Sequence, residues 1–87
     1  MTIQELFSDR EYVKDELLRM REAWGNIHTF DEATIDASRK TLGFMQLYAP
    51  EDMLGHIEAS IDELSRRETL MLFRPFYRAG QRAGQQV

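Results

Sequence analysis

The stretch TIQELFSDREYVKDELLRMREAW, residues 2–24, carries an apolar or long side chain at every third or fourth position. The steps between successive members are 3, 4, 3, 4, 3 and 4 residues, the repeat of a helix that packs along its whole length against other helices. The members are Ile3, Leu6, Arg10, Val13, Leu17, Met20 and Trp24. Both Thr2-x-x-Glu5 and Ser8-x-x-Glu11 have the spacing of a capping box. The pattern therefore predicts one long helix, or a short helix followed by a fresh start at Ser8.

Two further helices are predicted downstream. Gly25 and Asn26 suit a left-handed cap that ends the first helix, and Thr29–Glu32 opens the second with capping-box spacing. The second helix should stop near Tyr48, because the residue before Pro50 disfavours helical geometry. Its apolar stripe consists of Ile35, Ser38, Leu42 and Met45.

Pro50 suits the first position of the third helix. The third stripe consists of Leu54, Ile57, Ile61, Leu64 and Met71, with Glu68 interrupting it. Pro75 should kink or end this helix, because proline lacks the main-chain N–H of a helical residue.

The fold class that follows is all-α, because no segment shows sustained period-two alternation. Three helices with short connections indicate an antiparallel bundle, or a helical hairpin. Residues 1–78 form the single predicted domain, and residues 79–87 form a flexible basic tail. The sequence Arg-Ala-Gly-Gln occurs twice at this end of the chain, at residues 78–81 and 82–85. A chain of 87 residues without cysteine has a small core, so we expect it to gain burial as a dimer.

The charge distribution bears on the partner. All fifteen acids lie between Glu5 and Glu68, and Arg74, Arg78 and Arg82 give the last nineteen residues a charge of +3. An acidic body argues against nucleic acid as the main partner, because phosphate backbones are bound by clustered Lys and Arg. No signal peptide or membrane-spanning run is evident, so we expect a cytoplasmic protein.

Candidate catalytic and metal-binding residues are sparse. His28 and His56 are the only histidines, and neither has a second one a helical turn away, so no metal or other cofactor is expected. His56, Ser60 and Glu63 could suggest a catalytic relay, but all three share one predicted helix. The carboxylate pairs Asp15/Glu16 and Glu58/Asp62 are typical of solvated helix faces. The interpretation is a protein that is not an enzyme.

The stretch Leu70–Tyr77, LMLFRPFY, is too apolar all round for one helix face to bury it. Met, aromatic residues and Arg are typical anchors of protein contacts, so we predict an interface with a partner or a second copy. Its members are Leu70, Met71, Phe73, Arg74, Phe76 and Tyr77. The alternatives are a helix end that closes the core, and a membrane-surface helix edged by Arg74 and Arg78.

Three short islands resemble TraM-type antiactivators, which restrain plasmid conjugation. Together they cover about a fifth of the chain, and the first and last are closer together than in that family. They are Thr34-Ile35-Asp36-Ala37 with Arg39, Phe44-Met45-Gln46 leading to Ala49-Pro50-Glu51, and His56-Ile57-Glu58-Ala59-Ser60-Ile61. The resemblance implies a small, all-helical, dimeric protein that sequesters a LuxR-type quorum-sensing activator from its DNA.

A second resemblance lies on the same predicted third helix. Gly55–Glu58 together with Glu63–Glu68 is similar to the terminal helix of a small phage anti-CRISPR protein, whose fold is mixed α/β. Both families are compact protein inhibitors, and neither assigns a role to a particular residue here.

Three functional hypotheses follow. The leading one is a small helical inhibitor or antiactivator that occludes the working surface of a partner protein, either a regulator or a defence complex. The second is a structural or assembly subunit of a larger complex. The third is a helical oligomer that holds a small ligand between its helices.

Overall fold

The computed structural model describes the backbone of residues 1–85 and the side chains of residues 1–72. Its elements are α1 (Ile3–Phe7), α2 (Arg10–Gly25), α3 (Glu32–Tyr48), the 3-10 turn η1 (Glu51–Met53) and α4 (Leu54–Gln85). Residues 1–85 contain no strand, so the all-helical prediction is confirmed. None of the helices in this part of the chain is long and apolar enough to traverse a bilayer.

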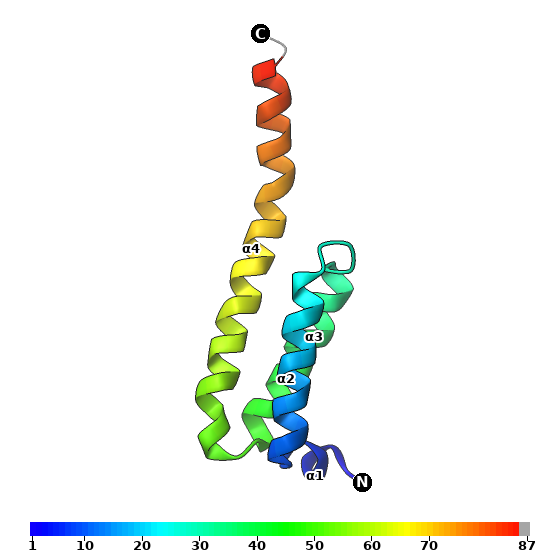
Figure 1. Ribbon diagram of the computed structural model, residues 1–87, viewed down its shortest axis with the longest axis vertical. Coiled ribbons are helices and arrows are strands. Elements are labelled where there is room, and N and C mark those ends of the chain that lie inside the picture. Colours follow the sequence, from blue (N-terminus) through cyan, green and yellow to red (C-terminus); the bar gives the residue numbers. More distant parts are fainter. Residues whose placement is uncertain (86–87) are drawn as a thin grey trace.

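The three longer helices lie side by side (Figure 1). α2 runs away from the N-terminal end of the molecule, α3 returns towards it, and α4 runs back in the direction of α2. The short α1 packs against both α2 and α3 at that end. α4 is twice as long as α2 and continues beyond the loop that joins α2 to α3, so the molecule is elongated, 60 × 22 × 16 Å.

The first predicted helix is interrupted, as its second capping box allowed. Thr2 caps α1, because its Oγ1 accepts a hydrogen bond of 3.1 Å from the main-chain N–H of Glu5. α2 is capped by Asp9, whose carboxylate accepts the N–H of Glu11 at 3.0 Å. Ser8 as the cap is wrong: its hydroxyl donates back to the carbonyl of Gln4. A carboxylate one residue later accepts the helix N–H groups and favours the positive helix end.

The cap of α3 is displaced in the same way. Asp31, and not Thr29, is the N-cap, and its carboxylate accepts the N–H of Thr34 at 2.9 Å. The left-handed cap predicted at the end of α2 is also wrong, because no described residue has a positive φ. The φ of Asn26 is −89°, and its side-chain oxygen instead accepts the N–H of His28 at 3.0 Å. A short local turn of this kind suits asparagine equally well.

The connection from α3 to α4 follows the prediction only in part. α3 ends at Tyr48, as predicted from Pro50. Pro50 does not begin α4, however, because the 3-10 turn Glu51–Met53 comes first. Pro75 was predicted to kink or end the third helix, and of these two outcomes the end is wrong, because α4 extends to Gln85. Proline removes one main-chain hydrogen bond, which bends a helix without necessarily terminating it. The flexible tail at 79–87 stays a prediction.

The core contains most of the predicted stripe residues from Val13 onward, but Met53 belongs to no predicted stripe, and Leu54, Ile61 and Met71 of the third stripe are only partly buried. The apolar residues that α2, α3, η1 and α4 bury between them are Val13, Leu17, Met20, Trp24, Ile35, Leu42, Met45, Met53, Ile57 and Leu64. The start of the first stripe is wrong, because Ile3 is exposed and Arg10 forms an ion pair with Asp52. The break between α1 and α2 shifts the helical phase, so that Phe7 is the buried residue of α1. Its ring stacks on Phe44 at 5.7 Å.

Candidate functional site

The predicted interface begins at Leu70. Leu70 and Leu72 are 67% and 59% exposed, whereas Met71 between them packs against the core. Successive helical residues are rotated by about 100°, so the two leucines flank Met71 on opposite sides of α4. The apolar surplus expected at this point is therefore present at residues 70–72. The other predicted members, Phe73, Arg74, Phe76 and Tyr77, have side chains outside the described residues.

Leu70 and Met71 line one hollow together with residues of the loop between α2 and α3. Ile27 of that loop is 62% exposed, Phe30 is half-buried, and both line a small hollow of about 70 Å³ together with the two α4 residues. We call Ile27, Phe30, Leu70 and Met71 the loop-end surface. It combines residues that are some forty positions apart in the sequence.

Trp24 and Arg67 hold the loop-end surface in place, and both line the same hollow. The indole Nε1–H of Trp24 donates to the hydroxyl of Ser38 on α3 at 2.9 Å, and both side chains are buried. The guanidinium Nη1 of Arg67 on α4 donates to the main-chain carbonyl of Trp24, also at 2.9 Å. All three long helices are thus joined by hydrogen bonds that involve two residues of this hollow, Trp24 and Arg67.

Sequence reasoning missed Ile27 and Phe30. They lie between two predicted helices, so neither belongs to a stripe with helical spacing. Only the composition of the loop could have pointed to them. Loops are usually polar, but this loop has two large apolar residues within a stretch of four positions.

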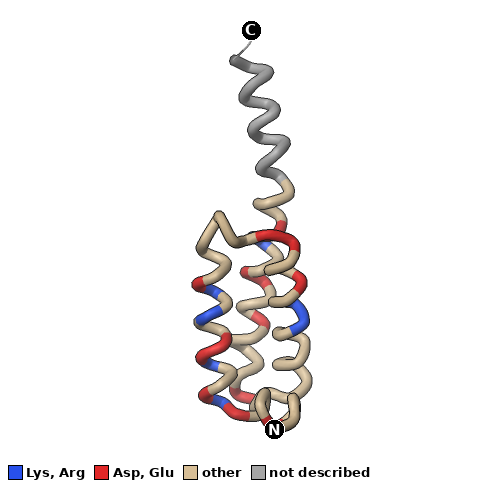
Figure 2. The backbone as a smooth tube through the Cα atoms, turned by 90° about the vertical axis from the view of Figure 1, so that its right-hand side faces the viewer, with Lys and Arg blue, Asp and Glu red and all other residues tan. Residues whose placement is uncertain are grey.

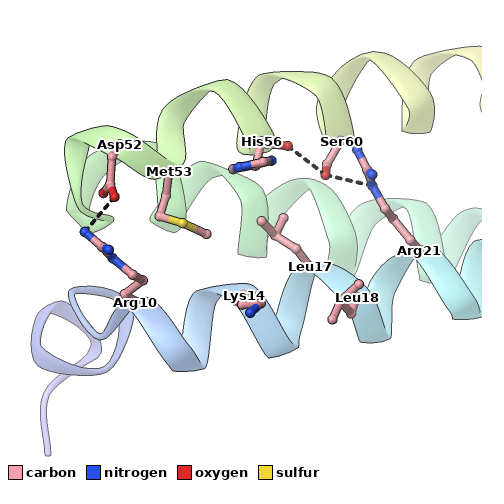
Figure 3. A pocket seen from close by; sticks show the side chains of 9 residues that line it. All are labelled: Arg10, Lys14, Leu17, Leu18, Arg21, Asp52, Met53, His56 and Ser60. Atoms are coloured by element: carbon pink, nitrogen blue, oxygen red, sulfur yellow. Dashed lines mark hydrogen bonds and ion pairs between the residues drawn. The ribbon is translucent and has the colours of Figure 1, made fainter.

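A second concave feature, which we call the α2–α4 groove, lies between residues 10–21 of α2 on one side and η1 with the beginning of α4 on the other (Figure 3). Its volume is about 410 Å³, within the range of small-molecule sites. The residues that line it are Arg10, Lys14, Leu17, Leu18, Arg21, Asp52, Met53, His56 and Ser60.

A polar link between the two sides closes each end of the groove (Figure 3). At one end Arg10 forms an ion pair of 2.6 Å with Asp52. At the other end Arg21 Nε donates to the hydroxyl of Ser60 at 3.1 Å and lies 3.3 Å from a carboxylate oxygen of Glu63. Between these links the side chains of Leu17 and Met53 form a buried apolar floor, and Leu18 stands at the rim, 56% exposed.

The groove is more basic than the chain as a whole. Acidic and basic residues are mixed along α2, four of each, so that this helix is neutral in a chain of charge −4 (Figure 2). The side of α2 that lines the groove is basic. The lining contains three cationic side chains, Arg10, Lys14 and Arg21, and one carboxylate, Asp52. Sequence reasoning missed this site because it depends on the rotation of α2 relative to α4.

The catalytic relay considered and set aside above, His56 with Ser60 and Glu63, is not assembled in this geometry. The hydroxyl of the buried Ser60 donates to the main-chain carbonyl of His56 at 3.0 Å and accepts the Arg21 bond, so its hydrogen does not point to an imidazole nitrogen. Glu63 pairs with Arg21 and Arg67. Within the described residues no three His, Cys, Asp or Glu side chains form a potential metal site.

Among the described side chains, two titratable groups have a shifted pKa, and both lie outside the groove. The hydrogen bond and charge of Glu16 raise the pKa of Arg19. The main-chain and side-chain hydrogen bonds from Thr34 lower the pKa of Asp31. Both shifts arise from local helix contacts rather than from an enclosed reactive centre.

Comparison with known proteins gives no relative on which to base a function: no protein-family model, curated protein or solved structure matches this chain.

Proposed function

We propose that this protein binds another protein through the loop-end surface and the adjoining part of α4, and thereby occludes that partner's working surface. The observation that most directly supports this proposal is that Ile27 and Leu70 are both exposed beside one apolar hollow. The hollow lies at the α2–α3 loop, beyond which only α4 continues (Figure 1). Exposed apolar side chains clustered around a depression are typical of protein contacts.

The hydrogen bonds beneath the surface favour a preformed site. Hydrogen bonds of Trp24 connect α2 to Ser38 of α3 and to Arg67 of α4. Trp24 and Arg67 line the same hollow as Ile27 and Leu70. A surface that is ordered before binding loses little conformational entropy when the partner docks. This property suits a sequestering protein of the inhibitor or antiactivator class, which must compete with the partner's own ligand.

The proposal also includes the arrangement of the helices and the oligomeric state. The working unit is an antiparallel three-helix bundle that forms a dimer, with a regulator or a defence complex as its target. Leu72 supports the dimer, because it is exposed on the opposite side of α4 from Leu70 and could serve a second contact. An assembly subunit of a larger complex is the competing function, and the following experiment separates the two.

The test places a photo-crosslinking amino acid at position 70 in the native cell, and in parallel at Leu47. Leu47 is the matched control, because it is also an exposed helical leucine but lies on α3 near the opposite end of the molecule. We expect a protein captured from position 70 only. The purified partner should lose its own activity on adding the chain, and Leu70→Gln should weaken binding about tenfold, as expected for an anchor residue.

The control Leu47→Gln should bind normally. A captured protein whose activity is unchanged by saturating amounts of the chain would favour the assembly subunit. Equal capture from positions 70 and 47, or unchanged affinity of Leu70→Gln, would refute the loop-end surface as the binding site.

A further inference from the structure

We propose that the α2–α4 groove binds a small amphipathic carboxylate, a molecule with one anionic head and a medium-length unbranched apolar chain. This site is separate from the proposed protein-binding surface. The groove is built from residues 10–21 and 52–60, whereas the loop-end surface is built from residues 27–30 and 70–71.

The closed ends of the groove favour a small molecule over a helix from a partner. The links made by Arg10 and Arg21 stand eleven residues apart on α2, which corresponds to about 16 Å along the helix axis. A partner helix, about 10 Å in diameter, would have to break one of these links to lie lengthwise between α2 and α4. An extended alkyl chain fits between the links without disturbing them.

The lining of the groove indicates the apolar part of the ligand. Leu17 and Met53 form the floor, and Leu18 at the rim is exposed to water in the absence of a ligand. An alkyl chain lying on this floor would cover Leu18, which removes apolar surface of both molecules from water.

Charge complementarity indicates that the head group of the ligand is anionic. Among the described side chains, Arg10 and Arg21 have carboxylate partners, whereas no acidic group forms an ion pair with Lys14. Lys14 lies on α2 between the two end links, and His56 lies on the α4 side (Figure 3). The ammonium of Lys14 provides a charge for a carboxylate, and the imidazole of His56 provides a further N–H donor.

The test titrates the full chain with decanoate, below the concentration at which decanoate forms micelles, and follows the backbone amides by NMR. We expect saturable shifts at residues 14–18 and 53–60 and little change at the loop-end surface. Decyltrimethylammonium, which has the same chain length and the opposite charge, should bind more weakly.

Two variants probe the two parts of the ligand. Lys14→Gln should raise the dissociation constant for decanoate about two- to fivefold, the contribution of one exposed ion pair. Lys40→Gln is the matched control, because it removes the only other lysine, which lies on α3 outside the groove. Leu18→Gln should also weaken binding, and the fold should tolerate it because Leu18 is already exposed.

Several results would overturn the proposal. They are the absence of saturable shifts in the groove, equal binding of the cationic amphiphile, and equal effects of Lys14→Gln and Lys40→Gln. A ligand-free dimer that Leu18→Gln dissociates would instead make a second copy of the chain the occupant. None of these results bears on capture from position 70, so the two proposals fail independently.

Discussion

The guanidinium of Arg67 on α4 donates a hydrogen bond to the main-chain carbonyl of Trp24, the penultimate residue of α2. The last carbonyls of an α-helix have no partner within the helix and carry its negative end. A cation from a neighbouring helix therefore satisfies the end of α2 and fixes α4 against it.

We expect Arg67→Ala to lower the free energy of unfolding by about 1 kcal/mol, since a hydrogen bond from a charged donor is lost at a partly exposed position. Urea denaturation followed by circular dichroism measures the change. Arg66→Ala is the control, because Arg66 is exposed and forms no ion pair with a described side chain. Equal effects of the two substitutions would contradict the capping role of Arg67.

Ser38→Ala should destabilise the protein by about 1–2 kcal/mol, although alanine is the better helix former. The substitution leaves the indole N–H of Trp24 buried without an acceptor. Ser65→Ala, at an exposed position of α4, should be neutral or slightly stabilising. Thermal unfolding of the two variants checks the difference, and a stabilised Ser38→Ala protein would exclude the buried hydrogen bond.

Gly43→Ala should raise the free energy of unfolding by about 0.5–1 kcal/mol. Gly43 lies within α3, its φ is not positive, and a β-carbon added there meets no atom within 4 Å. Alanine restricts the unfolded chain more than glycine does and so favours the helix. An unchanged or lower midpoint in urea would mean that the space beside Gly43 is filled, as in a dimer contact.

Asp31 should contribute to acid unfolding. Its pKa is lowered in the folded protein by hydrogen bonds from Thr34, so its stabilising effect is complete above the unfolded value of about 3.9. The effect is lost as the pH falls through the lower folded value. Asp31→Asn, which keeps an acceptor oxygen, should make stability less dependent on pH below about 4. Asp36→Asn, on an exposed face of α3, is the comparison, and identical acid profiles for wild type and Asp31→Asn would contradict the prediction.

The chain should self-associate at micromolar concentration, where analytical ultracentrifugation would give a mass above the 10.2 kDa of one chain. If residues 70–77 form the contact, Phe73→Ala and Tyr77→Ala should weaken association by about 1–3 kcal/mol each and leave the helix content intact. If these residues close the core instead, the substitutions should cost about 3–5 kcal/mol of stability. A clean monomer of the wild type at micromolar concentration would exclude self-association.

The sequence predicted the helices better than their ends. Val13, Leu17, Met20 and Trp24 are buried as their spacing indicates, because a continuous stripe has only one way to face a core. Helix caps depend on a choice between neighbouring polar residues of similar strength, and Asp9 caps α2 where Ser8 was expected.

The two candidate sites depend on tertiary geometry. The exposure of an apolar residue near Leu70 could be predicted, because the four consecutive apolar residues LMLF cannot all lie on one buried face of a helix. The neighbouring Ile27 could not be predicted, since no pattern relates a loop residue to a helix forty positions away. The α2–α4 groove depends on which flank of α2 faces α4, and periodicity determines the buried stripe but not its neighbours in space.

The distribution of ion pairs between elements has a consequence for the response to salt. Among the described side chains, Arg10, Arg21 and Arg39 all pair with carboxylates in the segment 52–68, whereas α2 and α3 are joined to each other by apolar packing and the Trp24–Ser38 bond. Added salt screens partly exposed charges but leaves apolar contacts intact. Rising ionic strength should therefore loosen α4 selectively and speed amide hydrogen exchange in residues 54–68 before the α2–α3 pair responds.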